Sequence, residues 1–418
     1  MKEVDEQPEE LLKTLRDMVE YKEELISFKE INKSITKTLE SCFYYSLDFN
    51  NQGKDTNKQF EIESVLDFLH EELNTGHWSE VPLSTRRCFT SASFVKCLTL
   101  LKCAQSFSVI LLRECLKCLD LGLLLGAPLE LNPELLTASA STLTQVINRK
   151  CEENLEIMEY KEVSVKRKLD NRTEYEGLKA KEIECSNVPS LECFNKHYFT
   201  PQIPVKLQGC MNYWPATKKW LDINYFLSTA GDRTVPIEIG SHYVDANWSQ
   251  KLMTLKEFVI NHYLEKSDSI GYLAQHNLFE QIPELKEDIC IPDYCSLSLD
   301  YENSTDPDIN AWFGPKGTVS PLHFDPKNNL LAQVYGTKQL LLFSPEDSPF
   351  LYPHEESMLF NTARVNPVEP DLETYPEFSK ATMFKCLLEP GEILFMPVKW
   401  WHHVTAMDKS FSVSFWWQ

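Results

Sequence analysis

The chain has 418 residues, 43% of them hydrophobic and 11% aromatic, which is enough apolar material for a folded core and suggests two or three domains. Its 62 acidic and 41 basic residues give a formal net charge of −21. Because this surface repels phosphates, direct binding to DNA or RNA is disfavoured, whereas basic peptides are favoured as partners.

Neither a secretion signal nor a membrane span is expected. The first ten residues, MKEVDEQPEE, lack the basic and then apolar segments of a signal peptide, so we expect an intracellular protein. The longest apolar region, residues 93–125, is interrupted by charged side chains and is not expected to cross a bilayer.

The thirteen cysteines have no regular spacing, which predicts free thiols in an intracellular chain. Cys115 and Cys118 form a CxxC pair. We interpret this pair as part of a helix core, because neither a second pair nor a thioredoxin-like setting accompanies it.

Apolar residues recur at helical spacing through the first part of the chain. They do so at residues 11–19 and 65–73, and residues 94–125 continue the pattern until Gly126-Ala127-Pro128 stops it. No internal repeat is visible, which argues against a solenoid. We therefore predict an all-helical N-terminal domain over residues 1–150.

A charged linker is predicted over residues 151–186. The sequence there is rich in charge and offers few apolar side chains to bury. Its triplet Lys166-Arg167-Lys168 is compatible with a nuclear-import signal, although such a short run is more often a solvated face.

The remaining residues, 187–418, have the composition of a β-rich domain, with short alternating runs in place of helical periodicity. Residues 410–417 alternate large apolar side chains with serines, which predicts a strand. Leu330–Val334 and Lys338–Phe343, separated by Tyr335-Gly336-Thr337, predict a hairpin. Strands of this kind indicate a closed or double-sheet barrel, and the fold class is α+β.

A candidate metal site begins at His323 and Asp325. An oxygenase iron needs two histidines and one carboxylate on one face, which leaves three positions for a co-substrate and O2. On a strand these two side chains share a face, while Phe324 points away. The same spacing occurs at His70, in a helical region where it does not align side chains, and at His354, in an irregular stretch. Only the pair at 323 and 325 lies between a glycine-rich segment and the predicted hairpin.

The third ligand must come from a distant strand, and residues 390–404 contain two candidates. A turn at Pro390-Gly391 leads into an apolar run that ends in aromatics and then His402 and His403. Neighbouring residues of a strand point to opposite sides, so at most one of these histidines is a ligand. The chemistry of the sequence alone does not choose between them.

At these residues the sequence resembles the JmjC hydroxylases of the cupin superfamily. The likeness is carried by GTVSPLHFD at 317–325 and GEILFMPVKWWH at 391–402. It is closer still to the JmjC domain-containing protein 5, or lysine demethylase 8, family, in which a helical region precedes the catalytic domain. The resemblance implies a double-stranded β-helix, a jelly-roll and cupin-like fold, over residues 187–418. It also implies a catalytic Fe(II) held by His323, Asp325 and His402, because the ligand lies five residues after the strand proline.

The resemblance further implies 2-oxoglutarate as co-substrate, consumed with O2 to give succinate, CO2 and a hydroxylated product. The far carboxylate of 2-oxoglutarate needs a cation or a hydroxyl. Lys338 is the candidate, although a lone strand lysine more often lies at a solvated edge. In the family pattern Tyr272 assists Lys338, and Ser320 and Asn329 also contact the co-substrate.

Similar members of the family are implicated in C-3 hydroxylation of arginyl residues in proteins, so the resemblance implies this activity for the chain. An arginine pocket needs a carboxylate for the guanidinium and aromatic walls for the stem. Glu238, Trp248 and Trp312 match the substrate positions of the family, although an aromatic such as Trp312 is more often a core residue.

Two other functions stay open. Histone methyl-lysine demethylation would use the same iron chemistry in a chromatin regulator, but no clustered Cys/His pairs indicate a reader module. A non-catalytic interaction scaffold is disfavoured, because all three ligands and Lys338 are present. We expect protein or peptide substrates with basic residues, arginine or histone lysine. We also expect no direct nucleic-acid or membrane partner, and the nucleus as the location, with the cytoplasm as the alternative.

Overall fold

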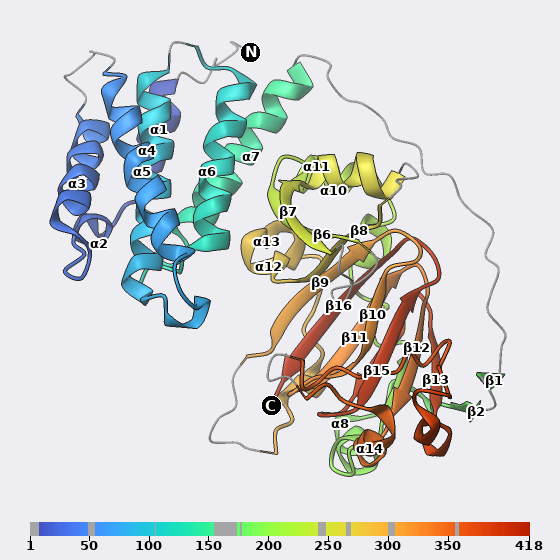
Figure 1. Ribbon diagram of the computed structural model, residues 1–418. Coiled ribbons are helices and arrows are strands. Elements are labelled where there is room, and N and C mark those ends of the chain that lie inside the picture. The colour runs from blue at the N-terminus through green and yellow to red at the C-terminus, as the bar shows by residue number, and fades with distance from the viewer. Residues whose placement is uncertain are drawn as a thin grey trace. The chain divides into compact units, whose positions relative to one another are not determined.

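Figure 1 shows a computed structural model of the chain. The residues that it describes are 8–48, 55–104, 106–153, 174–175, 178–240, 248–264, 269–299, 306–355 and 359–418. The chain forms two compact units: the first comprises the N-terminal helices with residues 227–235 and 254–256, and the second comprises most of the rest. The triplet at 166–168 lies outside the described residues.

The N-terminal unit is helical, as predicted. Its helices are α1 (Pro8–Asp17), α2 (Lys22–Ile26), α3 (Lys33–Leu47), α4 (Asn57–Leu73), α5 (Leu83–Cys103), α6 (Val109–Leu125) and α7 (Leu135–Glu153). Helix α5 packs against α1, α3, α4 and α6 and is buried along most of its length. In the described part of the chain, no helix is both long and apolar enough to span a membrane.

The predicted helical stretch at 94–125 is divided between α5 and α6. Ser108 begins α6, and its Oγ accepts a hydrogen bond from the N–H of Leu111 at 3.2 Å, which satisfies one of the free donors of a helix N-terminus. Cys115 and Cys118 are buried free thiols within α6, as predicted.

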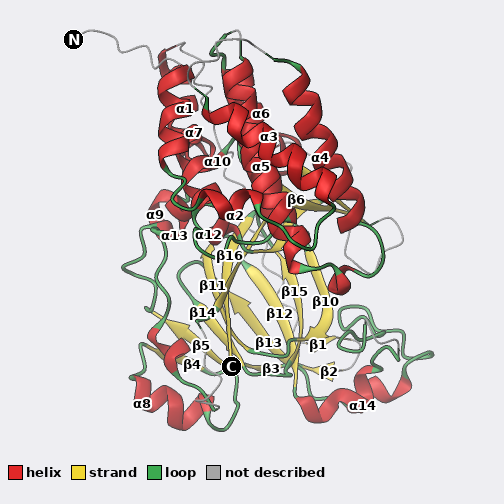
Figure 2. Ribbon diagram, turned by 90° about the vertical axis from the view of Figure 1, so that its left-hand side faces the viewer, coloured by secondary structure: helices red, strands yellow, loops and turns green. Residues whose placement is uncertain are grey.

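The second unit contains two sheets, whose strands are drawn in yellow in Figure 2. One has the order β10-β15-β12-β13-β3 and the other the order β4-β5-β14-β11-β16-β9-β8-β6-β7. The strands are β3 (Lys181–Glu182), β4 (Cys185–Asn187), β5 (Val205–Gln208), β6 (Thr234–Ile239), β7 (Ser249–Thr254), β8 (Gly271–His276), β9 (Asp308–Gly314), β10 (Val319–Phe324), β11 (Asn328–Tyr335), β12 (Lys338–Phe343), β13 (Phe384–Leu388), β14 (Ile393–Met396), β15 (Trp401–Ala406) and β16 (Ser410–Trp417). Among the described residues the two sheets stay separate, so the fold is a double-sheet jelly roll and not a closed barrel.

Short helices and one small ribbon complete this part of the chain. They are α8 (Leu191–Phe194), α9 (Ala216–Lys219), α10 (Ile223–Ala230), α11 (Leu255–Phe258), α12 (Leu278–Gln281), α13 (Pro283–Lys286) and α14 (Ser348–Leu351), with β1 (Glu174–Tyr175) paired to β2 (Leu178–Lys179). The last residues of the predicted linker enter the sheets, because β3 pairs with β13 and β4 pairs with β5.

The predicted hairpin between β11 and β12 is wrong. Strand β11 pairs with β14 and β16, whereas β12 pairs with β13 and β15, so the chain crosses from one sheet to the other. The crossing occurs at Gly336, whose φ is +73°, and a Cβ there would lie 2.1 Å from the carbonyl oxygen of Lys409. A tight turn between two apolar runs has the same local signature in both arrangements, which is why the sequence did not separate them.

Strand β16 is present at the predicted residues, and both of its faces are buried. Phe411 and Phe415 belong to the outer face, where Phe411 packs against Trp220 with ring centroids 4.5 Å apart. On the inner face the Oγ of Ser412 donates to the side-chain oxygen of Gln333 at 2.6 Å. The serines thus form part of a polar interior between the sheets.

Candidate metal centre and co-substrate cavity

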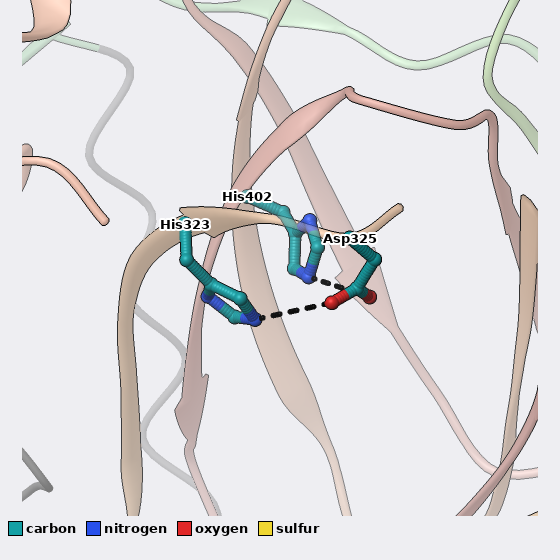
Figure 3. A group of neighbouring side chains, drawn as sticks. All are labelled: His323, Asp325 and His402. Carbon is teal, nitrogen blue, oxygen red and sulfur yellow. Dashed lines mark ion pairs between the residues drawn. The ribbon is translucent and has the colours of Figure 1, made fainter. Parts of the chain in front are cut away.

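The predicted ligands come together where β10 and β15 lie side by side. His323, near the end of β10, is directly opposite His402 in β15, and Asp325 follows β10. The Nε2 of His323 lies 3.8 Å from Oδ1 of Asp325, and the Nε2 of His402 lies 3.6 Å from its Oδ2 (Figure 3). The three ligand atoms all fall within 4.8 Å of one another. This is the one such cluster that could hold a metal in the parts of the chain that the structure describes.

Both imidazoles are held in the tautomer that a metal requires. The Nδ1 of His323 lies 2.7 Å from the carbonyl oxygen of Pro321, and the Nδ1 of His402 lies 3.0 Å from that of Trp400. A carbonyl only accepts, so each Nδ1 carries a proton, which in a neutral ring leaves the lone pair that a metal needs on Nε2. Burial, with a smaller effect from His323, lowers the pKa of His402 to about 4, so this ring is neutral at pH 7.

This donor set fits Fe(II). Two neutral imidazoles and one carboxylate on one side of a cavity are the ligands of non-haem iron oxygenases, which keep the other positions open. The neighbouring His403 is buried but does not line the cavity. The family pattern and the geometry therefore favour the same histidine, His402.

A cavity of about 340 Å³ opens beside the ligands. Its lining consists of Tyr272, Trp312, Ser320, His323, Asp325, Asn329, Leu331, Lys338, Met396, His402 and Val404. All four residues predicted to contact 2-oxoglutarate are in this lining. Tyr272 and Asn329 belong to the larger sheet and Ser320 and Lys338 to the smaller one, so both sheets contribute to the lining.

Lys338 is a buried cation that lines the same cavity as the metal ligands. Its side chain belongs to the central strand β12 and the residue is 2% exposed, so it is not a solvated edge lysine. Its Nζ donates to the hydroxyl of Tyr272 at 3.2 Å, and burial lowers the pKa of Lys338 to about 7. The Oδ1 of Asn329 is also buried and has no hydrogen-bond partner. A cavity with such unsatisfied polar groups fits an anionic, polar ligand.

The three predicted substrate residues differ in position. Trp312 lines the cavity, and its Nε1 donates to the Oγ of Ser414 at 2.9 Å. Glu238 and Trp248 do not border the cavity, but Glu238 lies opposite Tyr272 in the pairing of β6 with β8. Burial raises the pKa of the Glu238 carboxyl, and the nearby Trp248 indole offsets part of this increase. The buried N–H of the Trp248 indole has no partner in hydrogen-bonding geometry.

Sequence analysis did not single out the apolar part of the lining. Leu331 comes two residues after Asn329 and Val404 two residues after His402, so strand alternation carries both into the cavity. Met396 lies opposite Asn329 in the pairing of β11 with β14. Strand alternation therefore indicates Leu331 and Val404 from the sequence, whereas the position of Met396 depends on which strands pair.

Comparison with known proteins places the chain among cupin proteins. The cupin-like domain family matches residues 190–418. The chain is 41% identical to Lysine-specific demethylase 8 of Xenopus tropicalis, over 85% of this chain and 87% of that protein. It is 44% identical to Lysine-specific demethylase 8 of Danio rerio, over 84% and 86%. It is also 41% identical to Jumonji C domain-containing protein 5 of Drosophila melanogaster, over 85% and 86%.

Proposed function

We propose that this chain, which belongs to the JmjC family of cupin-fold, 2-oxoglutarate-dependent oxygenases, hydroxylates C-3 of arginyl residues in protein substrates. The observation that supports this proposal is the position of a half-buried carboxylate, Glu238, opposite Tyr272, which lines the cavity that contains the metal ligands. The chain thus has both the residues that would hold iron and a carboxylate that could bind a guanidinium.

The residues of the cavity divide into those for the metal and those for the co-substrate. His323, Asp325 and His402 would hold Fe(II), which when bound supplies the activation of O2 and the oxidative decarboxylation of 2-oxoglutarate. Lys338, with the Tyr272 hydroxyl, would bind the far carboxylate of 2-oxoglutarate by a charge-assisted hydrogen bond. Ser320 and Asn329 would orient the co-substrate from β10 and β11.

Arginine is favoured because of where its charge must lie. When C-3 is the carbon that reacts, the guanidinium extends well past the reacting atom and needs a carboxylate at that distance. Glu238 on β6 would provide such a carboxylate, and the indole of Trp312, which lines the cavity, would provide an aromatic wall. A methyl-lysine reacts at the end of its side chain and requires no anion beyond it.

Methyl-lysine demethylation is the second candidate, and the names of the relatives favour it. The two vertebrate relatives and a further one from Arabidopsis thaliana, 36% identical over 86% of both chains, are called lysine-specific demethylases. The iron and co-substrate residues would be the same, and the hydroxylated methyl group would leave as formaldehyde. We infer basic protein substrates and a nuclear location for both candidates.

The test is mass spectrometry of arginine-containing and methyl-lysine-containing peptides incubated with the protein, Fe(II) and 2-oxoglutarate. We expect the gain of one oxygen on arginine, its loss in His323→Ala, and its reduction in Glu238→Gln while co-substrate turnover without peptide continues. Removal of a methyl group with formaldehyde release would establish the demethylase instead. Succinate formation with neither product would refute both substrate assignments.

A further inference from the structure

The residue between two metal ligands is held by one side chain that sequence analysis did not single out. The N–H of Phe324 donates to the main-chain oxygen of Asn361 at 3.0 Å. The side-chain Nδ2 of Asn361 donates in turn to the carbonyl oxygen of Phe324, also at 3.0 Å. Asn361 therefore binds both peptide groups that separate His323 from Asp325.

Asn361 begins a short segment that is hydrogen-bonded to the chain on both of its sides. Strand β10 is the end strand of its sheet, and the segment after Asn361 pairs along its outer side: the N–H of Ala363 donates to the oxygen of Leu322 at 2.8 Å. On the far side of this segment the N–H of Arg364 donates to the oxygen of Tyr352 at 2.9 Å. The ligand strand thus has β15 on one side and a braced segment on the other.

These contacts determine how two ligands face each other. The torsions φ and ψ of Phe324 set the relative direction of the His323 and Asp325 side chains, whose nearest ligand atoms are 3.8 Å apart. Rotation about these torsions would break a hydrogen bond to Asn361 at one or the other peptide group. A metal site requires its ligands to be held within a few tenths of an ångström before the ion arrives.

We propose that Asn361 is a positioning residue for the metal centre, in which its side-chain amide holds the Phe324 carbonyl and thereby presets the His323–Asp325 pair for the ion. This inference rests on the metal site of the proposed function but not on its substrate. The main-chain contact would be available to any residue at this position. The side-chain donor requires an amide, so the role can be tested by substitution.

Two variants separate positioning from electrostatics. Asn361→Ala removes the donor, and Asn361→Asp keeps the size but replaces the donor with an anion. The added charge would attract a cation, so an electrostatic effect alone would tighten metal binding. Loss of positioning would weaken it in both variants. Asn366→Ala is the matched control, because Asn366 is exposed, follows on the same segment and bonds only locally, to the N–H of Val368.

The experiment measures binding of Mn(II) alone to the full-length, metal-free protein by electron paramagnetic resonance of the free ion. We expect both Asn361 variants to bind Mn(II) about tenfold more weakly than wild type, with Asn366→Ala unchanged. Thermal unfolding of the metal-free proteins is recorded in parallel, because a merely structural asparagine would lower Tm without changing the Kd for Mn(II).

The inference is tested by comparing the affinities of these variants for Mn(II). It is overturned if Asn361→Ala binds Mn(II) within twofold of Asn366→Ala, or if Asn361→Asp binds more tightly than wild type. If Asn361→Ala does not fold, the isosteric Asn361→Asp carries the comparison. Failure of wild-type protein to bind Mn(II) would overturn the metal site and this inference together. Weakened binding in both variants without an arginine product would overturn only the substrate assignment.

Discussion

Two buried cations, one in each unit, have opposite surroundings. In the helical unit Arg233 is 1% exposed and donates twice to Asp120, at 2.7 and 2.9 Å, and the second oxygen of Asp120 accepts from the N–H of Thr234 at 2.7 Å. In the sheet unit Lys338 is equally buried, but no carboxylate among the described residues pairs with it. A buried charge without a counter-charge costs stability. The missing carboxylate is the one that 2-oxoglutarate would bring.

Uncharged buried groups show a weaker form of this contrast. In helix α5 the buried hydroxyl of Ser93 donates to the carbonyl of Phe89, and that of Thr99 donates to Val95, both at 2.8 Å. In the cavity the Oδ1 of Asn329 has no partner. The cavity thus keeps a polar acceptor beside the metal ligands for a bound molecule, as expected where function opposes stability. In α5 the buried hydroxyl of Ser91 also has no partner, so the difference between the two interiors lies mainly in their charged groups.

The largest effect should come from removing Asp325, the one carboxylate among the described residues that line the cavity. Asp325→Ala deletes one of three ligands, so we expect succinate formation to fall on the order of 1000-fold. Unfolding of the metal-free protein should change little, because the carboxylate lies between two imidazoles that do not need it for folding. Asp371→Ala, at an exposed site outside the cavity, should retain activity. Comparable turnover in the two variants would contradict the metal centre.

Breaking the buried ion pair between Asp120 and Arg233 should destabilise the fold. Asp120→Ala removes the carboxylate to which the buried Arg233 donates twice, so the free energy of unfolding should fall by about 3–5 kcal/mol. Denaturant unfolding measures this loss, with the exposed Asp67→Ala of α4 as the control, for which we expect a change below about 0.5 kcal/mol. Equal stabilities for the two variants would show that the pair contributes no more than a surface acid.

Lys338→Met should stabilise the metal-free protein, whereas Asp120→Ala destabilises it. Methionine has a similar shape without the buried charge, so we expect metal-free stability to rise by about 1–2 kcal/mol at pH 7. Binding of 2-oxoglutarate should weaken about 100-fold, because a charge-assisted hydrogen bond is lost. Calorimetric titration and thermal unfolding test both parts. A destabilised variant would mean that Lys338 has a structural role.

The smallest effect is a pH dependence. Burial lowers the pKa of Lys338 from 10.5 to about 7, so in that interval the unfolded chain binds more protons and the stability of the empty protein should rise with pH. Bound 2-oxoglutarate raises this pKa again, so binding takes up a proton above pH 7. We expect affinity to fall by up to about tenfold per pH unit. Titrations in buffers of different ionisation enthalpy count the protons, and Lys338→Met should show none of this uptake.

Much of the site followed from local periodicity. A spacing of two residues on a strand carries His323 and Asp325 to one face, and the structure places them within reach of one ion. The family pattern supplied His402 and Lys338, and both line the same cavity. The family pattern also named Glu238, which lies opposite Tyr272 and not in the cavity lining. Tertiary contacts were needed for Asn361, which carries no motif.

By itself the sequence determined the helical N-terminal part, the β-rich C-terminal part, the family, and which side chains share a face, because helical and strand periodicities are properties of a few consecutive residues. Only the tertiary structure decided that β11 and β12 enter different sheets, that Lys338 is desolvated, and that Asn361 holds the ligand strand. These features depend on pairing between segments far apart in the chain. The sequence near each residue carries no record of its distant partner.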